Sequence, residues 1–423
     1  MVHDVSMYDL VSSLSEAIDL ISPLVADHNL QTAWIAFSIG KEMNLGDHAL
    51  SNLVLASSLH DVGGLSLRDR LDALRFDAED NRHGQVGAAL LSQFPPFSAL
   101  ARIIREHHLP WEAMHTTEAR RREPDLSEEE QWLRGILFLA DRADVLIRQD
   151  MPLLPQAEGI LGQLSASESG RFCPEALMAF RVVAGHEDFW MALESGMYRS
   201  FLAEGIHCER MEIGGQAMMD MFSLFSRIVD FRSPYTATHS AAVAACAGLL
   251  GEKMGFSDDE RLMLEMAGYL HDLGKLSVPT EVLEKHEPLT TDEFSLMRGH
   301  PFLTGKVLRC LNGFEQVRAW SSQHHERVNG TGYPSRVQGA ALPLGSRILA
   351  VADVFVALTE ERPYRIGMSV EKAGQIMDQM VEQSFLDPKV MEILDLHREE
   401  MDELRSQVQE KAQQEYVVFS KCL

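Results

Sequence analysis

One stretch of the sequence concentrates side chains that bind metal ions. Residues 324–334 read His-His-Glu-Arg-Val-Asn-Gly-Thr-Gly-Tyr-Pro, so two imidazoles and a carboxylate run into a turn rich in Gly and Asn. Further His and Asp residues lie before and after it, on successive segments with helical periodicity: His239, His271, Asp272, His300 and Asp353. Imidazole and carboxylate ligands without a thiolate suit Fe and Mn. Helices that converge on an axis can build such a site in their core, so the sequence predicts a metal centre.

Two of these strings resemble a known family. His271-Asp272-Leu273-Gly274-Lys275, followed later by residues 324–334, is similar to the HD-GYP family, a branch of the HD metal-dependent phosphohydrolases. The resemblance covers roughly residues 211–397, about half of the chain. The His-Asp dipeptide alone would carry little weight, whereas both strings in this order are highly specific. The resemblance implies an HD-type helical fold and hydrolysis of a cyclic dinucleotide.

The resemblance also implies two divalent ions, Fe or Mn in the first place and Ni or Mg as alternatives. Seven residues make up the implied ligand set: His239, His271 and Asp353 for one ion, His300, His324 and His325 for the other, and Asp272 as the carboxylate that bridges them. Lys275 is expected to stabilise the charge that develops on the phosphoryl oxygens. Some members hold a third ion through a Glu four residues before the first His; Tyr235 occupies that position here, so two ions are expected.

Substrate contacts are expected from the Gly-Tyr-Pro turn and from a basic pair near residue 363. Gly332 and Pro334 would hold Tyr333 so that it lines the pocket or stacks on a base; alternatively, the turn only shapes its loop. Arg362 and Arg365 match the family's substrate-binding basic pair, and their guanidinium groups could grip phosphate. The alternative for these two arginines is a solvated charge cluster at a helix end.

One position departs from the family pattern. The family commonly has Asp-x-x-Asp in the Asp353 segment, but Val356 stands where the second acid is expected. If that acid normally pairs with the lysine of the His-Asp motif, Lys275 is freer or differently aimed in this chain. The departure bears on rate and substrate choice rather than on the metal centre.

Composition narrows the class of protein. A chain of 423 residues exceeds the size at which one hydrophobic core keeps growing, so two domains are expected. The net charge of −25 argues against a nucleic-acid polymer as partner, because no basic stripe displaces its counterions. The five cysteines are scattered without a Cys-x-x-Cys pair, which indicates free thiols in a reducing cytosol. With no secretory signal and no long apolar stretch, we expect a cytoplasmic protein that does not enter the membrane.

A spacing pattern of the C-terminal half recurs in the N-terminal half. Two intervals repeat: 32 residues for His28–His60 (60 − 28) and His239–His271 (271 − 239), and 24 for His83–His107 (107 − 83) and His300–His324 (324 − 300). The segment ending at Asp141 also echoes the segment ending at Asp353. The sequence therefore predicts tandem HD-type helical domains, residues 1–200 and residues 201–423, of which the second is HD-GYP.

The first predicted domain is degenerate. Gly64 replaces the lysine, and Leu109-Pro110-Trp111 stands where the second domain has its Gly-Tyr-Pro turn. A possible ligand set remains: His28, His60, Asp61, His83, His107, His108 and Asp141. Three hypotheses follow: a metal-free scaffold that packs against its twin, a metal-holding sensory or dimerising module, or an active phosphohydrolase acting on another substrate such as a phosphomonoester.

The remaining segments complete an all-α prediction. Any strand is expected to be limited to a short hairpin near residues 333–343, and residues 392–417 predict one long amphipathic helix, either solvated or used for dimerisation. The leading hypothesis is a phosphodiesterase that opens cyclic di-GMP or 3',3'-cyclic GMP-AMP to the linear dinucleotide. Its alternatives are a catalytically weak receptor for the same nucleotide and a phosphohydrolase with monoesterase activity in the first domain. A homodimer or a signalling protein bound at the Gly-Tyr-Pro loop is the expected protein partner.

Overall fold

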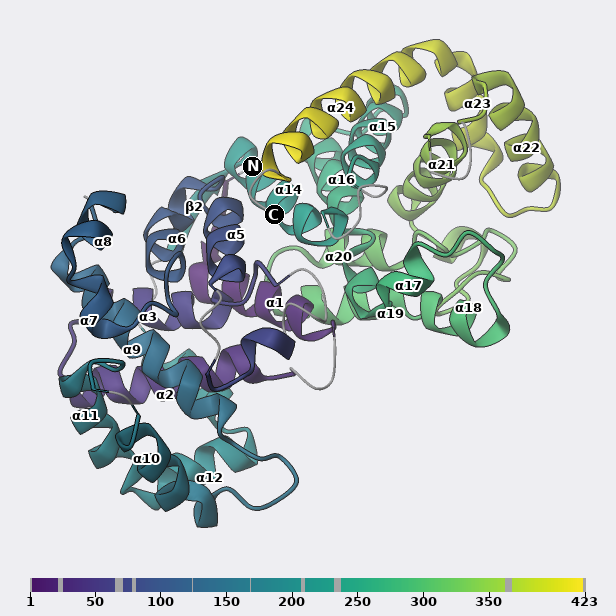
Figure 1. The fold of residues 1–423 in the computed structure, drawn as a ribbon. Coiled ribbons are helices and arrows are strands. Elements are labelled where there is room, and N and C mark those ends of the chain that lie inside the picture. Colours follow the sequence, from purple (N-terminus) through teal and green to yellow (C-terminus); the bar gives the residue numbers. More distant parts are fainter. Residues whose placement is uncertain are drawn as a thin grey trace. The chain divides into compact units, whose positions relative to one another are not determined.

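A computed structural model describes residues 2–21, 26–64, 71–77, 81–123, 125–167, 169–206, 210–231, 237–361 and 367–420. Its regular structure is almost entirely helical, which confirms the predicted all-α class (Figure 1). The chain forms two compact units: one comprises Met1–Val5 and Glu212–Lys421, and the other comprises Ser6–Met211 and Cys422–Leu423. Among the described residues, no helix combines the length and the apolar character that a membrane crossing requires.

The C-terminal unit is a cluster of helices around α15 and α21. Its helices are α14 (Gly215–Asp230), α15 (His239–Lys253), α16 (Asp258–Leu270), α17 (Thr280–Leu283), α18 (Thr291–Met297), α19 (His300–Val307), α20 (Glu315–Ser322), α21 (Leu344–Thr359), α22 (Val370–Glu382), α23 (Pro388–Leu396) and α24 (Arg398–Phe419), with short 3₁₀ turns η4 (Leu273–Ser277), η5 (Leu308–Cys310) and η6 (Gly339–Ala341). Helix α15 packs against α16, α21 and α24. The Ser257 hydroxyl accepts from the Glu260 amide, and the Glu260 carboxylate accepts from Ser257 in return, so a capping box starts α16.

The N-terminal unit repeats this arrangement. Its helices are α1 (Met7–Asp19), α2 (His28–Glu42), α3 (Asp47–Leu59), α5 (Arg82–Leu91), α6 (Ser98–Ile104), α7 (Trp111–Met114), α8 (Thr117–Arg122), α9 (Glu128–Val145), α10 (Ala157–Ser165), α11 (Pro174–Ala184), α12 (Glu187–Ser195) and α13 (Tyr198–Gly205), with 3₁₀ turns η2 (Pro95–Phe97) and η3 (Leu154–Gln156). Helix α2 packs against α3 and α9, as α15 packs against α16 and α21. The helices that carry the repeated histidines therefore have matching neighbours in the two units.

The predicted hairpin at residues 333–343 is wrong. The described residues there form no strand, and the two strands of the structure, β1 (Val2–Ser6) and β2 (Arg210–Gly214), pair with each other instead. The reason lies in Glu326, whose buried carboxylate accepts hydrogen bonds from the amides of Ser335 at 2.6 Å and Val337 at 3.1 Å. A side chain thus satisfies the backbone donors that a hairpin ladder would use.

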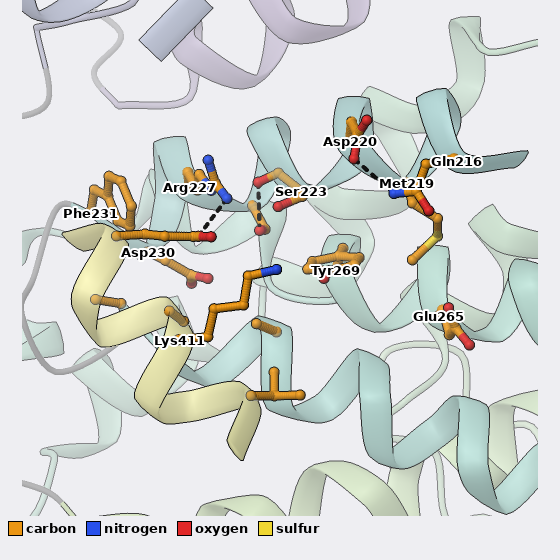
Figure 2. A pocket seen from close by; sticks show the side chains of 16 residues that line it. Gln216, Met219, Asp220, Ser223, Arg227, Asp230, Phe231, Glu265, Tyr269 and Lys411 are labelled. Carbon is orange, nitrogen blue, oxygen red and sulfur yellow. Dashed lines mark hydrogen bonds and ion pairs between the residues drawn. The ribbon is translucent and has the colours of Figure 1, made fainter. Parts of the chain in front are cut away.

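The predicted single helix over residues 392–417 is two helices. Helix α23 ends at Leu396, α24 begins at Arg398, and the backbone of His397 between them is not helical, with φ −120° and ψ 22°. The break lets both pieces bury apolar side chains, Leu394 from α23 and Met401 from α24. Helix α24 also closes a cavity of about 410 Å³ with α14, α15 and α16 (Figure 2).

This cavity is polar and is not lined by any of the seven predicted ligands. Figure 2 shows Arg227 and Asp230 at its α14 wall, where Arg227 pairs with Glu415 of α24 at 2.6 Å. Asp230 is buried and accepts a hydrogen bond from the Ser240 hydroxyl at 3.0 Å. Burial raises the pKa of Asp230 to about 7, so this carboxyl group is partly protonated at neutral pH.

A glycine at the same place in each unit brings two elements into backbone contact. A Cβ on Gly274, which follows His271-Asp272-Leu273, would lie 2.0 Å from the carbonyl oxygen of His300. A Cβ on Gly63 of the N-terminal unit would lie 2.1 Å from the carbonyl oxygen of His83. Only glycine allows this approach, which holds the His-Asp turn against the start of the next histidine-bearing helix.

We expect Gly274→Ala to destabilise the C-terminal unit. The added methyl group meets backbone that cannot move aside easily, and overpacking of this kind costs about 1–3 kcal/mol. Urea denaturation followed by circular dichroism measures the change in unfolding free energy. Gly214→Ala is the matched control, because a Cβ at Gly214 meets no atom within 4 Å. Equal midpoints for the two variants would contradict this account of the motif glycine.

Candidate metal centres

The structure brings the seven predicted ligands of the C-terminal unit together. They lie at the ends or in the middle of five helices: His239 begins α15, His271 and Asp272 follow α16, His300 begins α19, His324 and His325 follow α20, and Asp353 lies in α21. All are buried except His325, which is partly exposed. The ligand atoms form two triads, each with its atoms within 4.8 Å of one another: His239, His271 and Asp353 in one, and His300, His324 and His325 in the other.

Asp272 lies between the two triads and offers one oxygen to each. Its Oδ2 is 3.3 Å from Nε2 of His271, in the first triad. Its Oδ1 is 3.4 Å from Nε2 of His300, in the second triad. This is the position from which one carboxylate could bridge two ions.

Hydrogen bonds at Nδ1 aim three of the histidines at the centre. Nδ1 of His271 donates to the Gly268 carbonyl at 2.7 Å, and His300 and His324 make the same bond to the carbonyls three residues before them, at 2.7 and 2.6 Å. Because Nδ1 carries the proton, Nε2 is left as a lone-pair donor pointing into the cluster.

Two buried atoms of the cluster lack hydrogen-bond partners within the described residues: Nε2 of His271 and Oδ1 of Asp272. Unsatisfied buried polar atoms are costly and rare in folded proteins. A lone pair on an imidazole nitrogen and one on a carboxylate oxygen, both directed at the same space, are the donors that Fe, Mn and related divalent ions accept. The residues present therefore fit a divalent metal centre.

Burial and neighbouring charges divide the cluster into two electrostatic environments. Burial lowers the pKa of His300 and of His325 to about 3, and it holds the pKa of His324 well below its usual value. These three imidazoles are neutral at pH 7. Burial also acts to lower the pKa of His239, but Glu360 and Asp353 overcome it and raise that pKa to about 10. Without metal, His239 is therefore protonated.

Glu360 is a contributor that the sequence analysis missed. Its buried carboxylate lies 3.0 Å from Nδ1 of His239, beside the first triad. It follows Asp353 by seven residues, about two helical turns, and caps the C-terminal end of α21 with an extended backbone. That spacing was the available signal. Lys275, which we expected to be freer or differently aimed because of Val356, has its Nζ 2.5 Å from Oδ2 of Asp272.

Of the other predicted site residues, the structure describes those of the Gly-Tyr-Pro turn. A Cβ on Gly332 would lie 2.4 Å from the amide nitrogen of Arg327, so this position requires glycine. The Tyr333 ring lies 4.9 Å from the His325 ring, and the peptide bond between Tyr333 and Pro334 is cis. Arg362, Arg365 and Tyr235 lie outside the described residues.

The possible ligands of the N-terminal unit also gather in one buried cluster: His28, His60, Asp61, His83, His107, His108 and Asp141. Nδ1 of His60 and of His107 donates to the carbonyl three residues earlier, each at 2.8 Å. Nδ1 of His28 lies 2.6 Å from Oδ2 of Asp144. Asp144 thus does for His28 what Glu360 does for His239, from a position one turn rather than two turns beyond the ligand aspartate.

An arginine distinguishes the N-terminal cluster. The buried Arg142 guanidinium donates to Oδ2 of Asp141 at 2.8 Å and lies 3.4 Å from Nε2 of His108. Its other donors reach the carbonyls of Ala73 and Arg75. In the C-terminal unit the residue after the ligand aspartate is Val354. A fixed positive charge therefore stands inside this cluster, where it opposes a second divalent cation.

We expect Glu360→Gln to weaken metal binding by about 10- to 100-fold, the usual effect of losing the partner that orients a ligand histidine. The amide keeps the size of the side chain but removes the charge that holds His239. Inductively coupled plasma mass spectrometry after dialysis measures the metal content, and Asp144→Asn is the equivalent substitution in the N-terminal unit. Unchanged metal content in Glu360→Gln would show that His239 needs no such partner.

Metal uptake should depend on pH at one triad and not at the other. His239, with a pKa of about 10 in the metal-free protein, must lose a proton before it can bind an ion. The apparent affinity at its triad should therefore rise with pH, about tenfold per unit between pH 6.5 and 8.5. The affinity at the His300 triad should stay constant over that range because its imidazoles are already neutral. Isothermal titration of the metal-free protein with Mn²⁺ in buffers of different ionisation enthalpy counts the protons released. If no proton is released on binding, His239 is not protonated in the metal-free protein.

Comparisons with known proteins agree with this geometry. Family models of the HD domain match residues 25–146 and residues 223–390. The chain is 28% identical over 400 residues to the 3'3'-cGAMP-specific phosphodiesterase 1 of Vibrio cholerae serotype O1, covering 90% of this chain and 89% of that protein. It is 40% identical over 156 residues to the cyclic di-GMP phosphodiesterase response regulator RpfG of Xanthomonas campestris pv. campestris, covering 36% of this chain and 41% of that protein.

A solved structure gives the same fold. The crystal structure of a cyclic GMP-AMP-specific phosphodiesterase from V. cholerae matches with a TM-score of 0.65, over 93% of this chain and 98% of that chain. The sequences are 23% identical, so this likeness concerns the fold alone. With the two family matches and the relatives above, the chain is a tandem HD-domain protein, and its C-terminal half belongs to the HD-GYP family.

Proposed function

We propose that the C-terminal unit is a metal-dependent phosphodiesterase that hydrolyses a bacterial cyclic dinucleotide to the linear dinucleotide. The observation that carries the proposal is the pair of triads joined by Asp272. Two divalent ions, Fe or Mn from the donor set, would supply Lewis-acid activation of the phosphodiester and a nucleophile derived from water at neutral pH. The relatives' names support this substrate class.

The side chains around the triads have separate roles in this proposal. Lys275, held at 2.5 Å from Asp272 and partly exposed, carries a positive charge at the rim of the cluster, where phosphoryl oxygens gain charge in the transition state. Tyr333, whose ring is tilted by 34° against the ring of His325, offers a ring on which a base can lie. The seven ligands and Arg362 and Arg365 keep the roles that the family resemblance implies.

The two substrates remain alternatives within one class. Among the relatives, phosphodiesterase 1 is named for 3'3'-cGAMP and RpfG for cyclic di-GMP. The relative named for 3'3'-cGAMP matches along nearly the whole chain, whereas RpfG matches over about a third of it. This difference in coverage favours 3'3'-cGAMP as the first substrate to test.

For the N-terminal unit we propose a degenerate HD domain, residues 1–200, that does not cleave the cyclic dinucleotide. Arg142 supports this, because its guanidinium adds a fixed positive charge to the cluster. Gly64 in place of the lysine supports it as well, since the position three residues after Asp61 carries no cation. Residues 201–423 would then contain the whole catalytic apparatus.

The chain offers matched variants for the test. We expect metal-loaded wild type to cleave 3'3'-cGAMP, cyclic di-GMP or both. We expect His271→Ala with Asp272→Ala to reduce kcat by at least about a thousandfold, since the first triad loses His271 and both triads lose the carboxylate between them. His60→Ala with Asp61→Ala makes the same change in the N-terminal cluster and should leave the rate within about threefold. Chromatography of the products measures both.

Two results would contradict the proposal. Binding of either dinucleotide without cleavage would leave a receptor built on a metal centre. Loss of cleavage in the N-terminal variant alone would move the activity to the other unit.

A further inference from the structure

A phosphodiester is an anion, and this chain has a net charge of −25. A site that binds such a substrate therefore needs cationic side chains close to the phosphates. Lys275 at the cluster is already engaged by Asp272. Arg298 is a second cation near the site: it lies between α18 and α19, two residues before His300, and is partly buried. The structure records no hydrogen bond or ion pair of its guanidinium with any of the described residues. Its charge is therefore available to a ligand.

Aromatic rings hold this guanidinium near the metal cluster. Its carbon lies 4.9 Å from the centre of the Tyr333 ring and 5.9 Å from that of Phe294. The Tyr333 ring in turn lies 4.9 Å from the ring of His325, a member of the second triad. Guanidinium, tyrosine and imidazole thus form a continuous series from the surface to the cluster.

Contact with aromatic faces leaves the edge of a guanidinium free to donate. Cation–π contact fixes the plane of the group, and its N–H donors point outward from that plane, in the fork that matches two phosphate oxygens. Phe294 is 48% exposed, although it is a large apolar side chain. An exposed ring beside an available guanidinium suits a ligand that carries both a base and a phosphate.

We propose that Arg298 binds the phosphate of the cyclic dinucleotide that is not being cleaved. This rests on the proposed function. A cyclic dinucleotide has two phosphodiesters on opposite sides of one ribose-phosphate ring, and only one of them can lie at Asp272. Tyr333 separates Arg298 from the triads by the width of one aromatic ring. The guanidinium is therefore positioned for the second phosphate rather than for the scissile one.

The test compares a substrate that has a second phosphate with one that lacks it. Wild type, Arg298→Ala and Arg298→Lys are assayed on 3'3'-cGAMP, cyclic di-GMP and bis(p-nitrophenyl) phosphate. A charge-assisted hydrogen bond is worth about 1.5–3 kcal/mol, so KM for the dinucleotide should rise about 10- to 100-fold in Arg298→Ala. The ratio of kcat/KM between dinucleotide and bis(p-nitrophenyl) phosphate should fall by the same factor. Lysine, a point charge without the planar fork, should restore part of it.

Arg309→Ala is the matched control. Arg309 is exposed, follows α19, and its loss changes the net charge equally; among the described residues it has no recorded ring or carboxylate contact. Its KM should stay at the wild-type value. Metal content by mass spectrometry must be equal in all variants, because a structural role for Arg298 beside His300 would lower it.

The other outcomes decide against the role of Arg298, against the proposed function, or against both. An unchanged KM in Arg298→Ala, or an equal loss on both kinds of substrate, overturns the role of Arg298. If wild type binds the dinucleotide without cleaving it, the proposed function fails, and the dissociation constants of wild type and Arg298→Ala still decide the inference. If wild type neither binds nor cleaves it, both fail.

Discussion

Each half of this protein depends on a histidine that follows a helix end and donates Nδ1–H to the carbonyl three residues before it. The last carbonyls of a helix have no partner within the helix, so the imidazole satisfies one of them and is oriented by it. His271 does this after α16, and His60 does it after α3. Nε2 then points away from the helix end, and helices that converge bring these nitrogens together. One local hydrogen bond thus fixes ring orientation, tautomer and the geometry of the cluster.

The two units show how much can change around this constraint. Nδ1 of the first histidine of each cluster contacts a carboxylate instead. Asp144 supplies it one turn beyond Asp141, and Glu360 supplies it two turns beyond Asp353. Although Val356 has no carboxylate, Nδ1 of His239 still has a carboxylate partner. In place of the acid that the family pattern has at this position, Glu360 at the end of α21 contacts His239.

These relations explain what the sequence could predict. The interval between His28 and His60 equals that between His239 and His271 because helix lengths set both. Local periodicity reveals those helix lengths, so the all-α fold and the ligand residues could be predicted from the sequence. Glu360 was missed because its signal is a spacing from Asp353 to the end of the helix rather than a motif. Arg142 was missed because its position next to Asp141 in the sequence does not predict the direction of its side chain. In the structure its guanidinium contacts Asp141 and His108. The hairpin near residue 333 failed because Glu326, a side chain, took the backbone donors of that loop.

The setting of the fixed cation, rather than the ligand set, separates the two clusters. Both contain histidines with strongly lowered pKa values, among them His107 and His324, because burial disfavours the imidazolium ion. In the C-terminal cluster two cations, Lys275 and a protonated His239, face three carboxylates, those of Asp272, Asp353 and Glu360. In the N-terminal cluster Arg142 already neutralises part of the charge of Asp141. Against the effect of burial, Asp141 and Asp144 raise the pKa of His28 to about 10, so His28 matches His239. The difference is that Arg142 is buried and held by the carbonyls of Ala73 and Arg75, whereas Lys275 is partly exposed. A guanidinium fixed in this way cannot give its place to a metal ion, so similar ligands lead to unequal chemistry.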